Sequence, residues 1–77
     1  MPNIGKVLEI NLNNVGITTK NELIAFGSKQ VFTLIKTKDP TACVNKLMAI
    51  EGAIQGIRWH NLSGEVKAEM KKFYNKL

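Results

Sequence analysis

Hydrophobic residues recur along this chain with the period of an α-helix. In the first segment, the apolar positions on one helical face are Ile4, Val7, Leu8, Leu12 and Val15. Asn3 can cap the start of this helix through its side chain, and Gly16 can end it in a left-handed conformation. We therefore predict a first helix that begins after Asn3 and ends near Gly16.

Two shorter helices are predicted next. Thr19 and Glu22 fit a capping box, in which the threonine hydroxyl and the glutamate carboxylate each accept a backbone N–H hydrogen bond. Gly27 closes this very short second helix, and Ser28 is a candidate cap for a third helix that extends to about Lys36. The apolar face of the third helix consists of Val31, Phe32 and Ile35.

The fourth helix is predicted to be the longest and to begin at Asp39 and Pro40, because proline is preorganised for the first helical position. Its apolar stripe consists of Cys43, Leu47, Ile50 and Ile54. Small residues lie on neighbouring turns of this helix: Ala49, Gly52, Ala53 and Gly56. Since glycine inside a helix costs about 1 kcal/mol relative to alanine, Gly52 indicates close approach by another backbone. That backbone belongs either to the same chain or to a second copy across a homodimer seam.

The remainder of the chain predicts one connector and one helix. Residues 57–64 carry the only arginine, tryptophan and histidine, and the final helix has the apolar stripe Val66, Met70, Phe73 and Leu77. No strand pattern persists along the chain. A chain of 77 residues is also too short for two cores. The prediction is an all-α fold, with a single compact five-helix domain that spans residues 1–77.

Composition limits the environment and the partners. Eleven Lys and Arg residues against six Asp and Glu give a net charge of +5, which favours polyanions but also keeps a protein soluble. One cysteine excludes an intramolecular disulfide, and no apolar run approaches the ~20 residues of a membrane span. The first residues lack the pattern of an export signal. We expect a cytoplasmic protein without a membrane partner.

No group of residues has the pattern of a reaction centre. His60 has no second histidine or cysteine at metal-ligand spacing, which argues against a metal site. The glutamates are spread over separate helices, so nothing pairs two of them as acid and base. Cys43 and Trp59 are interpreted as core residues. The sequence therefore predicts no enzymatic activity, no cofactor and no small-molecule substrate.

The strongest functional hint is the opening turn, Pro2-Asn3-Ile4-Gly5-Lys6. This turn would present backbone N–H groups and a lysine at the positive end of a helix, which is the chemistry of a phosphate contact. A cation in the first turn opposes the helix dipole unless an anion lies nearby. The alternative interpretation is that Asn3 and Gly5 only cap the helix.

Three stretches together carry a resemblance to a known family. They are the opening turn, the segment Val15–Thr19, and the most specific one, Glu51-Gly52-Ala53-Ile54-Gln55-Gly56-Ile57-Arg58-Trp59-His60. These stretches resemble the C-terminal domain of the TfoX/Sxy competence-regulator family, whose members switch on natural transformation genes in bacteria. The resemblance implies a role in transcriptional regulation. This domain is also similar to helix-hairpin-helix folds such as the C-terminal domain of the RNA polymerase alpha subunit, where a Pro-Asn-Leu-Gly-Lys turn helps contact the DNA backbone.

The resemblance implies that four residues face DNA: Asn3, Ile4, Gly5 and Lys6. Two functions stay open at this point. The chain is either a non-enzymatic regulatory module with weak, sequence-independent DNA backbone contacts, or a protein interaction or homodimerisation module without nucleic-acid binding. In the second case a regulatory protein or a second copy would meet the small residues Ala49, Gly52, Ala53 and Gly56. Family regulators usually carry an additional N-terminal domain, whereas this chain begins at the turn, so we expect a stand-alone module.

Overall fold

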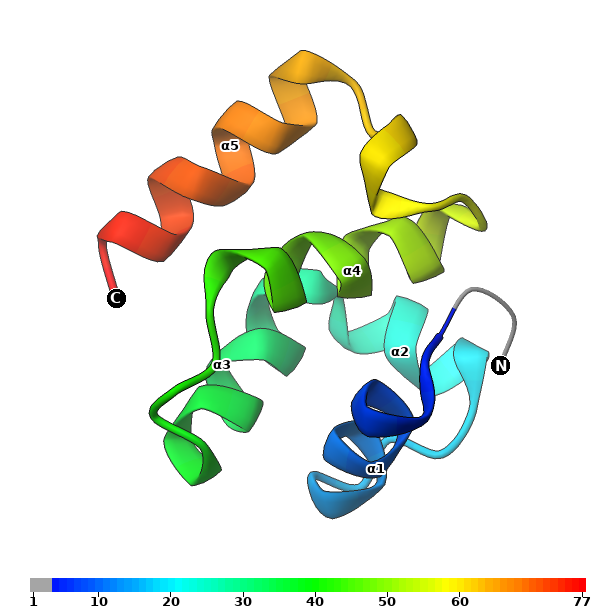
Figure 1. Ribbon diagram of the computed structural model, residues 1–77. Coiled ribbons are helices and arrows are strands. Elements are labelled where there is room, and N and C mark those ends of the chain that lie inside the picture. The colour runs from blue at the N-terminus through cyan, green and yellow to red at the C-terminus, as the bar shows by residue number, and fades with distance from the viewer. Residues whose placement is uncertain (1–3) are drawn as a thin grey trace.

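The fold consists of five α-helices and one short 3₁₀ helix in the computed structural model, which describes residues 4–77 (Figure 1). The elements are α1 (Lys6–Asn14), α2 (Lys20–Phe26), α3 (Ser28–Lys38), α4 (Val44–Gln55), η1 (Trp59–Asn61) and α5 (Gly64–Asn75). The predicted all-α class is confirmed. No helix in the described part of the chain is long and apolar enough to cross a membrane.

Helix α4 crosses the middle of the molecule, and most of the other elements pack on it (Figure 1). It contacts α2, α3, η1 and α5, while α1 packs on α3. Leu47, Met48 and Ile50 of α4 are almost completely removed from solvent. Burial of a side chain of this size contributes roughly 1.5–3 kcal/mol through the hydrophobic effect. Helix α4 therefore supplies the central part of the core.

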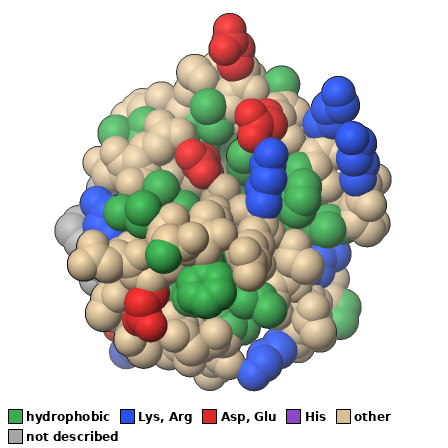
Figure 2. All heavy atoms as spheres, turned by 180° about the vertical axis from the view of Figure 1, so that it is seen from behind, with side chains coloured by type: hydrophobic (Ala, Val, Ile, Leu, Met, Phe, Trp, Pro, Cys, Tyr) green, Lys and Arg blue, Asp and Glu red, His purple; other side chains and the backbone are tan. Residues whose placement is uncertain are grey.

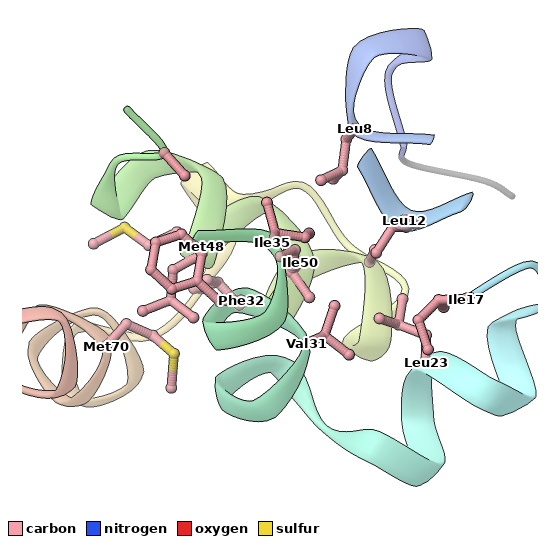
Figure 3. Packing of buried hydrophobic residues seen from close by; sticks show 14 residues of the cluster. Leu8, Leu12, Ile17, Leu23, Val31, Phe32, Ile35, Met48, Ile50 and Met70 are labelled. Atoms are coloured by element: carbon pink, nitrogen blue, oxygen red, sulfur yellow. The ribbon is translucent and has the colours of Figure 1, made fainter. Parts of the chain in front are cut away.

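The buried side chains of α4 belong to one hydrophobic cluster, which extends from α4 in two directions (Figure 3). Toward α1 and α2 lie Leu12, Ile17 and Leu23, and toward α5 lie Phe32, Met48 and Met70. All of these side chains are buried. The cluster ties the first and the last helix to α3 and α4.

Two helix boundaries agree with the sequence prediction in detail. Gly16 has a φ of 84°, and the N–H of the next residue, Ile17, donates to Leu12 O at 2.9 Å, as in a Schellman motif. Thr19 and Glu22 form the predicted capping box. The Glu22 N–H donates to the Thr19 hydroxyl, and the Thr19 N–H donates to the Glu22 carboxylate.

The starts of α1 and α3 differ from the prediction. Gly5 occupies the N-cap position of α1, and Asn3, the predicted cap, lies outside the described residues. Gly27 is the N-cap of α3, and Ser28 is its first helical residue. The buried Ser28 hydroxyl donates to the Glu51 carboxylate of α4 at 2.7 Å instead of capping its own helix. A hydrogen bond between helices has replaced the local cap that the pattern suggested.

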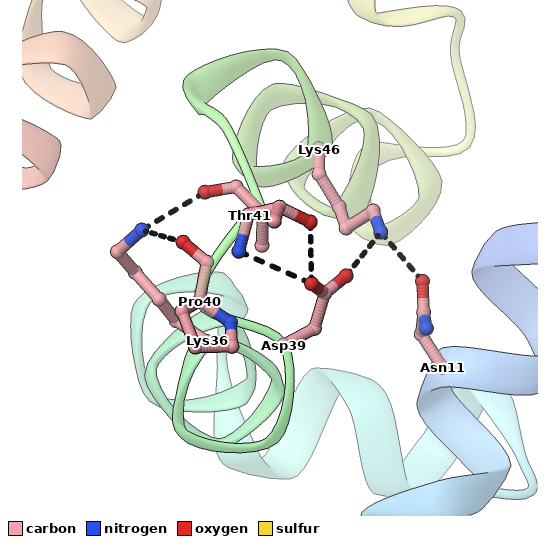
Figure 4. A network of polar contacts seen from close by, with 7 residues as sticks. Asn11, Lys36, Asp39, Pro40, Thr41 and Lys46 are labelled. Atoms are coloured by element: carbon pink, nitrogen blue, oxygen red, sulfur yellow. Dashed lines mark hydrogen bonds and ion pairs between the residues drawn. The ribbon is translucent and has the colours of Figure 1, made fainter.

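The predicted start of the fourth helix at Asp39 and Pro40 is wrong, because these residues form a turn before α4 (Figure 4). The Asp39 carboxylate accepts hydrogen bonds from the hydroxyl and the backbone N–H of Thr41, and it lies 3.7 Å from Lys46 Nζ. These Thr41 hydrogen bonds, and to a lesser extent Lys46, hold the pKa of Asp39 below its usual value. Lys36 Nζ also donates to Pro40 O at 3.1 Å. Side-chain hydrogen bonds of this kind compete with helix formation.

Cys43 is exposed, so the interpretation of this residue as part of the core is wrong. Because α4 begins at Val44, Cys43 is its N-cap residue with an extended backbone and lies before the helical stripe. The preceding residue, Ala42, is buried instead. Val7 and Leu77, which the pattern also places on apolar stripes, are 68% and 52% exposed. The apolar stripes thus fail mainly near the ends of helices.

Gly52 is the glycine that other parts of the described backbone approach most closely. A Cβ atom at this position would lie 2.8 Å from Ile57 O and 3.0 Å from Trp59 N. The Ile57 N–H also donates to Gly52 O at 2.9 Å. The close approach that the sequence indicated is therefore made by the connector of the same chain.

We expect Gly52→Ala to lower the free energy of unfolding by about 1–3 kcal/mol, because the added methyl group must displace the connector from α4. Thermal unfolding followed by circular dichroism should show a Tm several degrees lower than that of the wild type. Gly64→Ala is the matched control, since a Cβ atom at Gly64 would meet nothing within 4 Å. Equal stability of both variants and the wild type would contradict the close packing at Gly52.

The capping box predicts a specific dependence of stability on pH. The hydrogen bond from the Thr18 hydroxyl is the largest cause that lowers the pKa of Glu22 from its ordinary value of 4.5, and the Thr18 and Thr19 N–H groups add to it. Since the folded-state pKa is the lower one, this contribution to stability is complete above pH 4.5 and is lost as the pH falls through the folded-state pKa.

We therefore expect Glu22→Gln to lower the Tm at about pH 7, and we expect its difference from the wild type to shrink toward about pH 3. Glu65→Gln is the control, because Glu65, like Glu22, lies in the first turn of a helix and interacts favourably with the helix dipole. A difference between Glu22→Gln and the wild type that stays constant with pH would contradict the role of the carboxylate.

Candidate functional site

A groove of about 500 Å³ opens between the start of α1 and η1. Its lining comes from the N-terminal turn and α1 (Ile4, Gly5 and Leu8), from α4 (Ala49), and from η1 with the residue before it (Arg58, Trp59 and His60). In Figure 1 the start of α1 and η1 both lie in the right half of the view, near the end of α4. The structure thus joins two features that the sequence presents separately, the opening turn and the connector with the only tryptophan.

Packing of the connector fixes the η1 side of the groove. Trp59 is half-buried and packs against the core, and Leu62 just after η1 is buried. The Trp59 and His60 rings are stacked, with their centroids 3.9 Å apart and their planes at 28°. Lys67 Nζ of α5 donates to His60 O at 2.9 Å. These contacts hold a pair of aromatic rings in the wall of the groove.

The opposite side of the groove is an open helix end. Gly5 has an extended backbone, and no atom of residues 4–77 lies within 4 Å of the position that a Cβ atom would take there. The Glu9 N–H donates to Gly5 O at 3.0 Å, so the amides of residues 6–8 have no acceptor inside the helix. Lys6 is the first helical residue, and it is exposed. This end of α1 is accessible from solvent.

The structure places most of the residues expected to face DNA at this groove. Ile4 and Gly5 line it, and Lys6 follows directly in the chain. Asn3 lies outside the described residues. Ala49, which was assigned to a surface for a protein partner, also lines this groove.

The three other small residues of that predicted partner surface lie elsewhere. Gly52 and Ala53 are buried, and the connector of the same chain covers Gly52. Gly56 is exposed and ends α4 with a φ of 75° in the left-handed region. Packing within the chain and helix termination thus account for these glycines. The four small residues do not form a continuous face on the surface.

The described lining of the groove contains one cationic side chain, that of Arg58, and no carboxylate. Arg58 and His60 are both exposed there. A second groove, of about 460 Å³, contains Glu51 and Glu69, and its Lys29 is paired with Glu69 at 2.7 Å. On the face shown in Figure 2, lysines and carboxylates are interspersed with hydrophobic side chains. Of these two grooves, only the one beside α1 has a described lining without carboxylates.

The sequence did not predict that the connector lines this groove. Trp59 packs against the core as expected, but it also lines the groove together with Arg58 and His60. A signal was present, because the only arginine, tryptophan and histidine of the chain are consecutive. Among residues 4–77, no three His, Cys, Asp or Glu side chains come together in a way that could hold a metal ion.

The structure is that of a small all-helical domain whose groove beside α1 is lined by aromatic, aliphatic and cationic side chains. The family model described as the TfoX C-terminal domain matches residues 1–74. The chain therefore belongs to the TfoX C-terminal domain family, a non-catalytic domain family, and the resemblance seen in the sequence is confirmed.

Two solved structures are similar to this chain over nearly its whole length. One is a triclinic crystal form of an uncharacterized protein from Listeria monocytogenes, with 50% identity and a TM-score of 0.94 over 99% of this chain and 86% of that chain. The other is a tetragonal crystal form of a protein of unknown function from Listeria monocytogenes, with 51% identity and a TM-score of 0.93 over 97% of this chain and 92% of that chain. No significant match was found among curated proteins.

Proposed function

We propose that this domain is a regulatory module that makes weak, sequence-independent contacts with the DNA backbone through the opening turn and the neighbouring groove. One observation carries the proposal: the accessible end of α1 with Lys6 lies beside a groove whose described lining contains Arg58 and no carboxylate. Helix N-termini and exposed cations both favour phosphate oxygens. A role in transcription, including competence, belongs to this proposal through the family.

The number of cations at the groove sets the expected affinity. Lys6 and Arg58 can each neutralise a phosphate, and the amides at the start of α1 can donate hydrogen bonds to another. Such a small number of backbone contacts gives a Kd on the order of 10⁻⁴ to 10⁻⁶ M, which weakens as the salt concentration rises. Contacts of this kind carry no base sequence preference.

We expect Lys6→Glu and Arg58→Glu each to weaken binding to duplex DNA and to reduce its dependence on salt. Fluorescence anisotropy with a labelled duplex at about 50 mM and about 200 mM salt measures both effects. Glutamate at position 6 also suits the dipole of α1, so loss of binding would not reflect loss of that helix. Lys71→Glu is the matched control, because it makes the same change in net charge at an exposed position of α5 outside the groove lining.

Two results would contradict the proposal. Wild-type protein that does not bind duplex DNA at low salt would leave the protein interaction module as the function to pursue. An equal loss of binding in Lys6→Glu, Arg58→Glu and Lys71→Glu would show that net charge, and not this groove, determines the affinity.

A further inference from the structure

We infer that the groove between α1 and η1 accepts an unpaired nucleobase, so that the domain prefers single-stranded DNA to duplex DNA. This inference rests on the proposed function, because it assigns a ligand to the same groove. It adds a contact with a base to the contacts with phosphates. The inference is carried by one observation: stacked rings, aliphatic side chains and the Arg58 guanidinium line the same concave surface.

The apolar part of the lining suits the flat face of a base. Ile4, Leu8 and Ala49 contribute aliphatic side chains, while Trp59 and His60 contribute stacked rings. Bases of any identity stack on aromatic side chains, since each has a π face. The volume of about 500 Å³ lies within the range of sites that hold small planar ligands.

The same lining does not suit an intact duplex. Paired bases stack on one another, and only their edges are accessible in the two grooves of DNA. A base can therefore reach Trp59 only after it has left the stack. A single strand or a frayed end already presents such bases, so it loses less on binding.

Charge distinguishes a nucleotide from an apolar peptide as the occupant. Arg58 lies in the lining, Lys6 adjoins it, and no carboxylate is among the described lining residues. The net charge of the chain is +5. An aromatic side chain of a protein would use the apolar floor but would leave these cations without partners, whereas a nucleotide supplies both the ring and the phosphate.

The single tryptophan provides a direct test, because fluorescence excited at a wavelength that Tyr74 does not absorb reports only Trp59. Wild-type protein is titrated with oligothymidylate of about ten nucleotides, with a duplex of the same length, and with an abasic oligonucleotide of the same length. We expect oligothymidylate to quench Trp59 and to bind about tenfold more tightly than either of the other two ligands. The abasic strand separates stacking from charge, since it retains the phosphates and lacks the bases.

Substitutions at exposed residues test which side chains contact the base, and they leave the core unchanged. His60→Ala removes an exposed ring of the stacked pair, and it should weaken the binding of oligothymidylate more than the binding of duplex DNA, so that the preference for the single strand falls. Asn61→Ala, at the next exposed position of η1, is the matched control. Lys6→Glu should weaken the binding of all three ligands, because it removes a phosphate contact common to them.

The outcomes separate this inference from the proposed function. Equal affinity for the three ligands with unchanged Trp59 fluorescence, together with weaker binding by Lys6→Glu, would overturn the base contact and leave the backbone contact intact. Unchanged affinity for all three ligands in Lys6→Glu and Arg58→Glu would overturn the proposed function as well. Quenching by oligothymidylate that persists in His60→Ala without loss of preference would exclude the stacked pair as the platform.

Discussion

The connector can lie against α4 only because position 52 has no side chain, since a single added methyl group would meet Ile57 O at 2.8 Å. This contact fixes the path of the chain into η1 and thereby places Trp59 over the core. The core in turn holds η1 at the distance from α1 that leaves the groove open. A glycine that costs about 1 kcal/mol in helix propensity is thus required for the surface on which the proposed function depends.

The distribution of carboxylates supports the proposal that anions bind at this groove more strongly than the net charge alone supports it. Four of the six acidic side chains are bound within the fold: Glu22 in the capping box, Asp39 in the turn before α4, Glu51 with Ser28 and Gln55, and Glu69 with Lys29. None of these four lines the groove beside α1. Because an acidic group near a phosphate would repel it at short range, the acid-free lining matters more than a dispersed excess of lysine.

Local patterns predicted the helices well, and contacts between distant residues explain where they failed. The capping box at Thr19 and the terminator Gly16 depend on residues a few positions apart, so the sequence contains all that is needed to recognise them. Ser28 instead bonds Glu51, twenty-three positions away, and no local rule reveals that partner. The groove also depends on residues that are distant in the sequence, because only the packing of α1, α4 and η1 brings Ile4 and Trp59 into one lining. Composition could indicate an unusual connector, but only the fold could place it beside the opening turn.

The groove combines a ring pair that packing holds in place with two long cationic side chains that extend into solvent. Trp59 is held by the core and by its stacking on His60, and Lys67 fixes the backbone of His60. A ring that is already fixed loses little conformational freedom when a ligand stacks on it. Lys6 and Arg58 are long, exposed side chains that can follow phosphates in several positions. Affinity for DNA would then depend on these cations and on the salt concentration, while selection between paired and unpaired bases would depend on the ring pair.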